Sequence, residues 1–229
     1  MHPAVLLRAA VATPGRFPAL AGVDLELAQG DVVVLDGANG AGKTSVLRVC
    51  AGLLALSGGE GRVLGHDLAH QATVVRRSVG LLGHAPALYD ELTVTENVRF
   101  ALRACGAGLE AMDDALSRLG LSGRLAQTPA GRLSAGQRRR VALAVVAARA
   151  PRLWLLDEPH AGLDADGRRL LGELLGEALA AGASALIASH EPEEVVPLAD
   201  RIVTMAGGRV VASRRGTRRR LPPGTIHVA

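Results

Sequence analysis

Residues Gly37 to Thr44 read GANGAGKT and match the phosphate-binding loop pattern G-x-x-x-x-G-K-[ST]. An apolar, β-branched run at residues 32–35 precedes the loop and predicts a buried strand. The segment SVLRVCAGL follows it, and its apolar residues recur at helical spacing. A strand, a glycine-rich loop and a helix are the context that this motif requires. The stretch therefore predicts an α/β fold organised around a site for a nucleotide's phosphates.

The residues of this loop have distinct expected contacts with phosphate. Its glycines allow a tight turn that directs backbone N–H groups at phosphate oxygens, and the following helix N-terminus adds partial positive charge. Lys43 is expected to reach the β- and γ-phosphates, and the Thr44 hydroxyl to bind Mg²⁺. Lys43 is the single lysine among 26 basic residues, which places a compact ammonium where a planar guanidinium would not fit. The predicted binding residues are Gly37, Ala38, Asn39, Gly40, Ala41, Gly42, Lys43, Thr44 and Ser45.

Length and composition limit the class of protein. A chain of 229 residues predicts one large domain or a core with an inserted subdomain. Hydrophobic residues make up 48%, but the longest strictly apolar runs, such as residues 141–148, are shorter than the ~18 residues of a spanning helix. We expect a soluble or peripheral protein and, because no signal-peptide pattern opens the chain, a cytoplasmic location. Cys50 and Cys105 are isolated, so we expect small core residues and no disulfide or metal framework.

The formal net charge is +4, and much of the excess lies in the cluster Arg214 to Arg220. Such a cluster can bind anionic lipid or nucleic acid, or it can be a solvated tail. Because no aromatic or helical pattern accompanies the charge, we favour the solvated tail and predict no nucleic-acid partner.

The order of elements predicts how the chain is divided. Strand patterns occur at residues 4–11, 23–27, 78–82, 153–157, 184–189 and 201–205, and residues 57–68 predict a turn and a short strand. Helical patterns fill residues 93–127, where Thr93 or Thr95 can cap the first helix. Strands that alternate with helices favour a mostly parallel sheet covered on both faces. We expect a domain at residues 1–213, with its core at 1–85 and 141–213 and a helical subdomain at about 86–140, followed by a basic tail at 214–229.

Two carboxylates end the apolar strand at residues 153–157. In phosphate-loop hydrolases an acid at the end of a neighbouring strand holds Mg²⁺, and Asp157 fits that role. The next carboxylate can take a proton from the attacking water, so Glu158 is the predicted general base.

The segment LSAGQ, residues 133–137, precedes a helical pattern that begins with three arginines. Ser134 is placed to cap that helix, and Gly136 permits close approach to a ligand. From the residues alone, helix capping and phosphate binding are not distinguished.

GANGAGKT, LSAGQRRR, LWLLDEP, AGLD and Ser189-His190 occur in an order and spacing that resemble the ATP-binding-cassette (ABC) ATPases, over residues 4–212. The resemblance implies a P-loop NTPase with an N-terminal antiparallel β portion and an inserted helical subdomain. It implies ATP and Mg²⁺ at the interface of a head-to-tail homodimer. It also implies roles for residues outside the loop. Ser134, Ala135, Gly136 and Gln137 would contact ATP on the opposite subunit, and Asp164 would lie in the loop crossing the interface. His190 would contact the γ-phosphate and help position the attacking water, with Glu158 and Lys43 as the other catalytic residues.

Two further positions depend on the resemblance. Phe17 is the candidate for stacking on adenine, although an ordinary apolar contact explains it nearly as well. His84 stands where the family usually has glutamine, and an imidazole is shorter and titratable near neutral pH, so its contact with Mg²⁺ stays open. This histidine, the arginines after LSAGQ, the LWLLDEP strand and the GKTS ending are similar to the haem-exporter ATP-binding subunits of cytochrome c maturation systems.

The resemblance implies an ATPase that energises separate ABC transporter membrane subunits from the cytoplasmic face of the cell membrane. Haem-linked export in cytochrome c biogenesis is the expected task. The alternatives are the ATPase of another exporter, of drugs, lipids or peptides, and a soluble ABC assembly ATPase. A phosphate-loop kinase or GTPase is disfavoured because the chain has no N-K-x-D motif and LSAGQ has no role there.

Overall fold

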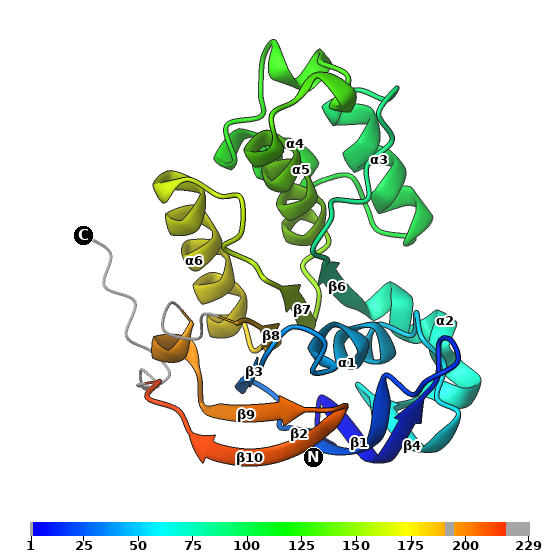
Figure 1. Ribbon diagram of the computed structural model, residues 1–229. Helices are drawn as coiled ribbons and strands as arrows, with labels where there is room; N and C mark the ends of the chain where they lie inside the picture. Colours follow the sequence, from blue (N-terminus) through cyan, green and yellow to red (C-terminus); the bar gives the residue numbers. More distant parts are fainter. Residues whose placement is uncertain (1, 191–194, 219–229) are drawn as a thin grey trace.

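The apolar strand ahead of the phosphate loop, β3 (Val32–Asp36), lies inside a six-stranded sheet of the computed structural model, which describes residues 2–190 and 195–218 (Figure 1). In spatial order the strands are β10 (Arg209–Arg215), β9 (Arg201–Ala206), β3, β8 (Ser184–Ala188), β7 (Leu153–Asp157) and β6 (Val79–Leu82). Neighbouring strands run parallel except β10, which is antiparallel to β9. The predicted α/β fold with a mostly parallel sheet is confirmed.

Both faces of this sheet are covered, and β3 shows how. Val32 and Val34 belong to the apolar cluster on the side of the large helices. Val33 and Leu35 belong to the cluster on the opposite side, with helix α1 (Lys43–Cys50). Because successive side chains of a strand point to opposite faces, a continuous apolar run is what such a strand requires.

A second, antiparallel sheet packs on the far side of α1. Its order is β2 (Leu20–Leu27), β1 (Val5–Ala12), β4 (Gly58–Val63) and β5 (His66–Asp67). Helix α1 contacts β1 and β4 of this sheet and β7 and β8 of the other, so it lies between them (Figure 1). The N-terminal antiparallel β portion is therefore present, and it holds α1 and the phosphate loop in place.

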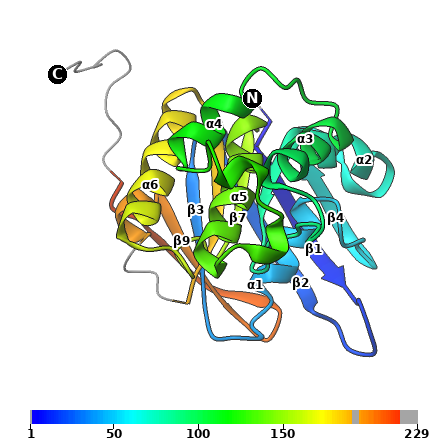
Figure 2. The same ribbon diagram turned by 90° about the horizontal axis from the view of Figure 1, so that it is seen from above.

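The remaining large helices are α3 (Val94–Ala104), α4 (Met112–Arg118), α5 (Ala135–Ala148) and α6 (Ala165–Ala180). Figure 2 shows α4 and α5 between α6 on one side and α3 on the other. Short 3-10 turns at Leu125–Gln127 and Ala130–Arg132 connect α4 to α5. The predicted helical insertion is thus seen as α3 and α4, and α5 leads back from it to the sheet.

Capping residues set where two of these helices begin. Thr93 caps α3 through a capping box with Glu96, in which the backbone N–H of each residue is bound by the other's side chain at 2.8 and 3.2 Å. Thr95 lies within the first turn, so Thr93 is the cap of the two candidates. Ser134 caps α5 in the same way with Gln137. Such caps typically contribute ~1 kcal/mol each to helix stability.

A helix and an edge strand have no counterpart in the sequence expectations. Helix α2 (Leu68–Ser78) fills the segment before β6, and strand β10 pairs along β9. Strand β10 includes Arg214 and Arg215, the first two residues of the predicted basic tail. Arg218 also contacts the domain, since its Nη1 lies 2.9 Å from an Asp200 carboxylate oxygen. The rest of the predicted tail, residues 219–229, lies outside the described residues.

The described part of the chain holds no helix that is both long and apolar enough to cross a bilayer. Cys50 is buried in α1, as expected of a core residue, and Cys105 is partly exposed after α3.

Candidate functional site

The phosphate loop joins β3 to α1 and depends on glycine at two close approaches. Gly37 and Gly42 have φ of +142° and +104°, which side chains on L-residues disfavour. A Cβ on Gly37 would also overlap the carbonyl oxygen of Met205, and one on Gly42 would lie 2.9 Å from that of Ala19. Neighbouring backbone atoms therefore leave no room for a side chain at these two positions of the turn, and only glycine fits at either of them.

Lys43 begins α1, and its side chain is buried. Its ammonium group donates hydrogen bonds to the carbonyl oxygens of Gly37 and Ala38 inside the loop. The only lysine of the chain thus sits over the loop, where its charge is desolvated and available to an anion.

Thr44 and Asp157 are 113 residues apart in sequence, and their side chains are hydrogen-bonded to each other. The Thr44 hydroxyl, in the first turn of α1, donates to the Asp157 carboxylate at 2.9 and 3.2 Å. Asp157 ends β7 and is buried. This donor set, one hydroxyl and one carboxylate, suits Mg²⁺, which usually takes one or two protein oxygens and fills its other positions with water and phosphate. No group of three or more His, Cys, Asp or Glu side chains that could hold a metal ion occurs in the described residues.

Glu158 directly follows β7, and His190 is two residues after the end of the neighbouring strand β8. The Nδ1 atom of His190 lies 2.9 Å from Oε2 of Glu158, and the two side chains are 51% and 15% exposed. The backbone N–H of Glu158 donates to the carbonyl of Ala188 at 2.9 Å. Glu158 has φ of +46°, a left-handed conformation that costs a non-glycine residue ~1–2 kcal/mol. Strain of this kind persists where the surroundings hold the backbone, and it is typical of active sites.

These side chains surround one cavity of about 430 Å³. Its lining consists of Ala19, Asn39, Gly40, Ala41, Gly42, Lys43, Thr44, Ser45, His84, Asp157, Glu158 and His190. The structure therefore brings together most of the predicted loop with both strand-end carboxylates and both histidines. Phe17 is not part of the lining and is 82% exposed, although Ala19, two residues further on, does line the cavity.

The LSAGQ residues lie apart from this cavity. Ser134 and Ala135 are exposed at the start of α5, and Gly136 and Gln137 are partly exposed. The Ser134 hydroxyl accepts from the backbone N–H of Gln137 at 3.2 Å, so capping is one role of this serine. This helix N-terminus faces outward, and the cavity of the same chain does not use it.

Asp164 lies beside the LSAGQ segment. A Cβ on Gly136 would be 3.2 Å from the carbonyl oxygen of Gly162, two residues before Asp164. Asp164 caps α6, and its carboxylate accepts from Arg140 at 2.6 and 2.8 Å. The hydrogen bond from Arg140 holds the pKa of Asp164 below its usual value. The second and fourth motifs therefore form one surface, separate from the phosphate loop.

Arg139, which the sequence interpretation did not select, connects these parts. It is 3% exposed and belongs to the buried face of α5. Its guanidinium donates to backbone carbonyls of Gly83 and His84 on one side and of Asp157 and Glu158 on the other. Burial lowers the pKa of Arg139, and the nearby Asp157 and Glu158 carboxylates act in the opposite direction. A signal was present in the sequence, because Arg139 shares a helical face with Leu143 and Val146.

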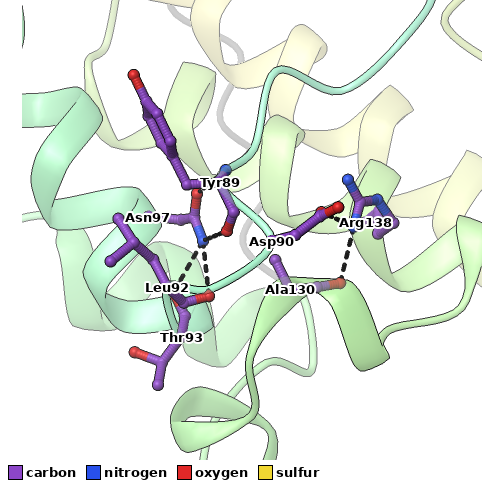
Figure 3. A network of polar contacts seen from close by, with 7 residues as sticks. All are labelled: Tyr89, Asp90, Leu92, Thr93, Asn97, Ala130 and Arg138. Atoms are coloured by element: carbon purple, nitrogen blue, oxygen red, sulfur yellow. Dashed lines mark hydrogen bonds and ion pairs between the residues drawn. The ribbon is translucent and has the colours of Figure 1, made fainter.

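The segment between His84 and α3 is held by a buried amide (Figure 3). Asn97 is 3% exposed, and its Nδ2 donates to the carbonyls of Tyr89, Leu92 and Thr93, each at 3.0 Å. Its Oδ1 accepts from the Tyr89 backbone N–H at 2.8 Å. The Tyr89 ring itself is exposed and packs edge-on against Phe100. The loop is therefore ordered from within while it presents an aromatic side chain outward.

A second contact in Figure 3 ties the same loop to α5. Arg138 lies 2.6 Å from an Asp90 carboxylate oxygen and donates to the carbonyl of Ala130 at 2.9 Å. The three consecutive arginines of α5 thus bind three different segments, with Arg138 on this loop, Arg139 at the strand ends and Arg140 on Asp164.

Comparison with known proteins identifies relatives along most of the chain. The family model described as ABC transporter matches residues 20–161. The cytochrome c biogenesis ATP-binding export protein CcmA of Methylococcus capsulatus is 44% identical over 176 residues, which cover 76% of this chain and 84% of that protein. The sulfate/thiosulfate import ATP-binding protein CysA 2 of Rhizobium meliloti is 40% identical over 206 residues, which cover 86% of this chain and 55% of that protein.

A solved structure, the dimeric structure of a bacterial ABC transporter cassette, has a TM-score of 0.84 with this chain. It is 25% identical in sequence, and the match covers 93% of this chain and 99% of that one. Similarity in sequence and in fold therefore points to the same class of protein as the five motifs.

Proposed function

The chain belongs to the ABC transporter ATPases, which hydrolyse ATP, and from this premise we propose that it energises separate membrane subunits in haem-linked export for cytochrome c biogenesis. The observation that carries the ATPase chemistry is the single cavity in which Lys43, Thr44, Asp157 and Glu158 meet. The cytochrome c assignment is supported by the match to the export protein, which covers 84% of that relative, whereas the chain spans about half of the sulfate importer.

In the proposed reaction, the loop N–H groups and Lys43 hold the β- and γ-phosphates of ATP. Water attacks the γ-phosphorus in line with the bond to ADP; a new O–P bond forms, the bond to the ADP oxygen breaks, and Glu158 accepts the water's proton. His190, 2.9 Å from Glu158, orients that carboxylate and the γ-phosphate. Mg²⁺ held by Thr44 and Asp157 would supply neutralisation of the phosphate charge.

A second copy of the chain completes the proposed site. Ser134, Ala135, Gly136 and Gln137 lie away from their own cavity and at a helix N-terminus, so they are available to the γ-phosphate bound by an opposing subunit. Asp164 would lie next to them at the same interface, because its loop is adjacent to Gly136. The similarity to a dimeric cassette supports this head-to-tail arrangement.

Two cavity assignments belong to the same proposal. His84 lines the cavity and would contact Mg²⁺ or the attacking water in place of glutamine. Phe17 would have to turn toward the cavity beside Ala19 in order to stack on adenine.

The membrane subunits would dock on the part of the chain that follows His84. We assign residues 86–140 to a helical subdomain that carries this contact, with the rest of residues 1–213 as the nucleotide-binding core. The ordered loop with its exposed Tyr89 and the acidic Asp90 lies on this subdomain (Figure 3). Docking there would place the protein at the cytoplasmic face of the cell membrane through its partners.

The test is affinity purification of the tagged chain and its Glu158→Gln variant from native membranes with ATP and Mg²⁺, with partners identified by mass spectrometry. A Glu60→Gln variant, changed at an exposed carboxylate of β4, is the matched control. We expect the Glu158→Gln variant to retain more of the membrane subunits of cytochrome c maturation than the control does. Recovery of other transport subunits would discard the haem assignment, and a purely soluble partner set would favour the assembly ATPase.

A further inference from the structure

The guanidinium of Arg139 joins two backbone segments that enter the cavity from different strands. Its Nη1 donates to the carbonyls of Gly83 and His84, after β6, and the second of these bonds is 3.2 Å long. Its Nη2 donates to the carbonyls of Asp157 and Glu158, after β7, at 2.9 and 2.7 Å. Each terminal nitrogen therefore binds one segment, and the planar guanidinium fixes the separation between the two segments.

This arrangement specifically requires arginine. Burying a cation is costly unless hydrogen bonds replace its hydration. Here four carbonyl oxygens do so for the two terminal nitrogens, while the buried Nε has no hydrogen-bond partner among the described residues. A guanidinium presents its donors in a rigid fork, whereas a lysine ammonium is a compact point charge on a flexible stem. Lysine at this position can bind one of the two segments but cannot span both in a fixed geometry.

The backbone of Glu158 is strained and is held in place by hydrogen bonds to other residues. Its φ of +46° is strained for a residue with a side chain, and Pro159 follows it. Its N–H is held by the carbonyl of Ala188, and its own carbonyl accepts from Arg139 and, at 3.1 Å, from the N–H of Ala161. Besides the bond to Ala188, Arg139 thus contributes a second contact that links this strained peptide to a different part of the chain.

We propose that Arg139 is a positioning residue that locks the backbone of Glu158 to the His84 segment, so that the Glu158 carboxylate and His84 keep one geometry toward the cavity. The inference rests on the proposed role of Glu158 as general base. It also implies that a movement of the LSAGQ segment would change the position of Glu158. Arg139 is five residues after Ser134 in α5, about 7.5 Å along the helix axis, so an opposing subunit that moves the start of α5 also moves the Arg139 lock.

The test compares Arg139→Gln and Arg139→Lys with Arg149→Gln in the full chain. Arg149 is the matched control, because its guanidinium also donates to a backbone carbonyl, that of Arg76 at 3.0 Å, but at the far end of α5. Hydrogen exchange is measured in peptides covering residues 83–88 and 157–163. We expect faster exchange in both peptides for Arg139→Gln, in at least one for Arg139→Lys, and in neither for the control.

The kinetic readout separates positioning from a general loss of structure. We expect kcat for ATP to fall by about 10²-fold in Arg139→Gln, the scale of a misplaced catalytic group, while KM for ATP stays within about twofold. Arg139→Lys should retain an intermediate kcat. If Arg139→Gln does not fold, the exchange pattern and kcat of Arg139→Lys decide the question.

Unchanged exchange in both peptides, or an equal loss of protection throughout the chain, would overturn the role of Arg139. A Glu158→Gln variant measured in parallel keeps the two proposals distinct. If that variant turns over ATP normally, the general-base assignment fails, and the exchange result still reports whether Arg139 joins the two segments.

Discussion

The Nδ1 atom of His190 lies 2.9 Å from the Oε2 atom of Glu158, and the pairing of β7 with β8 explains why. Asp157 is the register partner of Ala188, so the residues that follow each strand emerge side by side at the same edge of the sheet. A histidine and a glutamate that are 32 positions apart in sequence therefore lie in contact at the cavity.

The first prediction concerns this pair. Glu158→Gln should lower kcat for ATP hydrolysis by ~10² or more, the usual contribution of a positioned acid or base. His190→Ala should lower it as well, and the double variant should be about as slow as Glu158→Gln alone, because residues that act as a unit are not additive. Steady-state phosphate release measures all three. Losses that multiply would mean that the two residues work independently.

The second prediction concerns Thr44 and Mg²⁺. Thr44→Val replaces a hydroxyl by a methyl group of similar size and removes one proposed ligand, so the Mg²⁺ concentration for half-maximal hydrolysis should rise by about tenfold. The control is Thr95→Val, which removes a hydroxyl bonded to the carbonyl of Ala126 at 3.0 Å, away from the cavity. A Mg²⁺ titration of ATP turnover should leave that control at the parent value. Equal midpoints for both variants would exclude Thr44 as a ligand.

The third prediction concerns the buried amide of Asn97. Asn97→Ala leaves the carbonyls of Tyr89, Leu92 and Thr93 without this donor, and unsatisfied buried groups typically cost ~1–3 kcal/mol of unfolding free energy. Urea denaturation measures the loss. Gln127→Ala, an exposed amide of the same region, should change stability by less than about 0.5 kcal/mol. Comparable values for the two variants would show that the network in Figure 3 is not stabilising.

The fourth prediction concerns the two thiols. Burial raises the pKa of the Cys50 thiol to about 12, so at pH 8 it is protonated and lacks the nucleophilic thiolate. Cys105 is partly exposed. A thiol-reactive dye at pH 8 should label one cysteine of the folded chain and both in denaturant, and Cys105→Ser should abolish labelling of the folded chain. Rapid labelling of Cys50 under native conditions would contradict this burial.

Much of the fold could be predicted because its strands carry unambiguous patterns. The strands β3, β7 and β8 each contain four consecutive apolar residues, a pattern typical of strands covered on both faces. Helix α2 was missed because it buries only Val75 and shows no continuous apolar face. Strand β10 was missed because its residues are mostly exposed and three of the seven are arginine, so backbone pairing with β9 holds it in place while burial contributes little.

The candidate site also has features that the sequence predicts and features that it does not. Its loop and its two carboxylates stand in local patterns whose chemistry can be predicted residue by residue. The left-handed backbone of Glu158 and the lock by Arg139 depend on contacts between segments distant in sequence, which no local pattern contains. A run of three arginines is typical of a solvated helix face. The helical spacing of Arg139 with Leu143 and Val146 indicates that the middle arginine is buried, but it does not indicate the four carbonyls to which that arginine donates.

The most direct test of the central claim measures ATP turnover and the mass of the particle together for the parent chain and Glu158→Gln, with ATP and Mg²⁺, by light scattering after size exclusion. We predict that the variant binds ATP, remains a dimer of two chains with two ATP molecules, and releases phosphate ~10²-fold or more slowly than the parent, which releases ADP and separates. A Glu158→Gln chain that hydrolysed ATP at the parent's rate would show that Glu158 is not the general base.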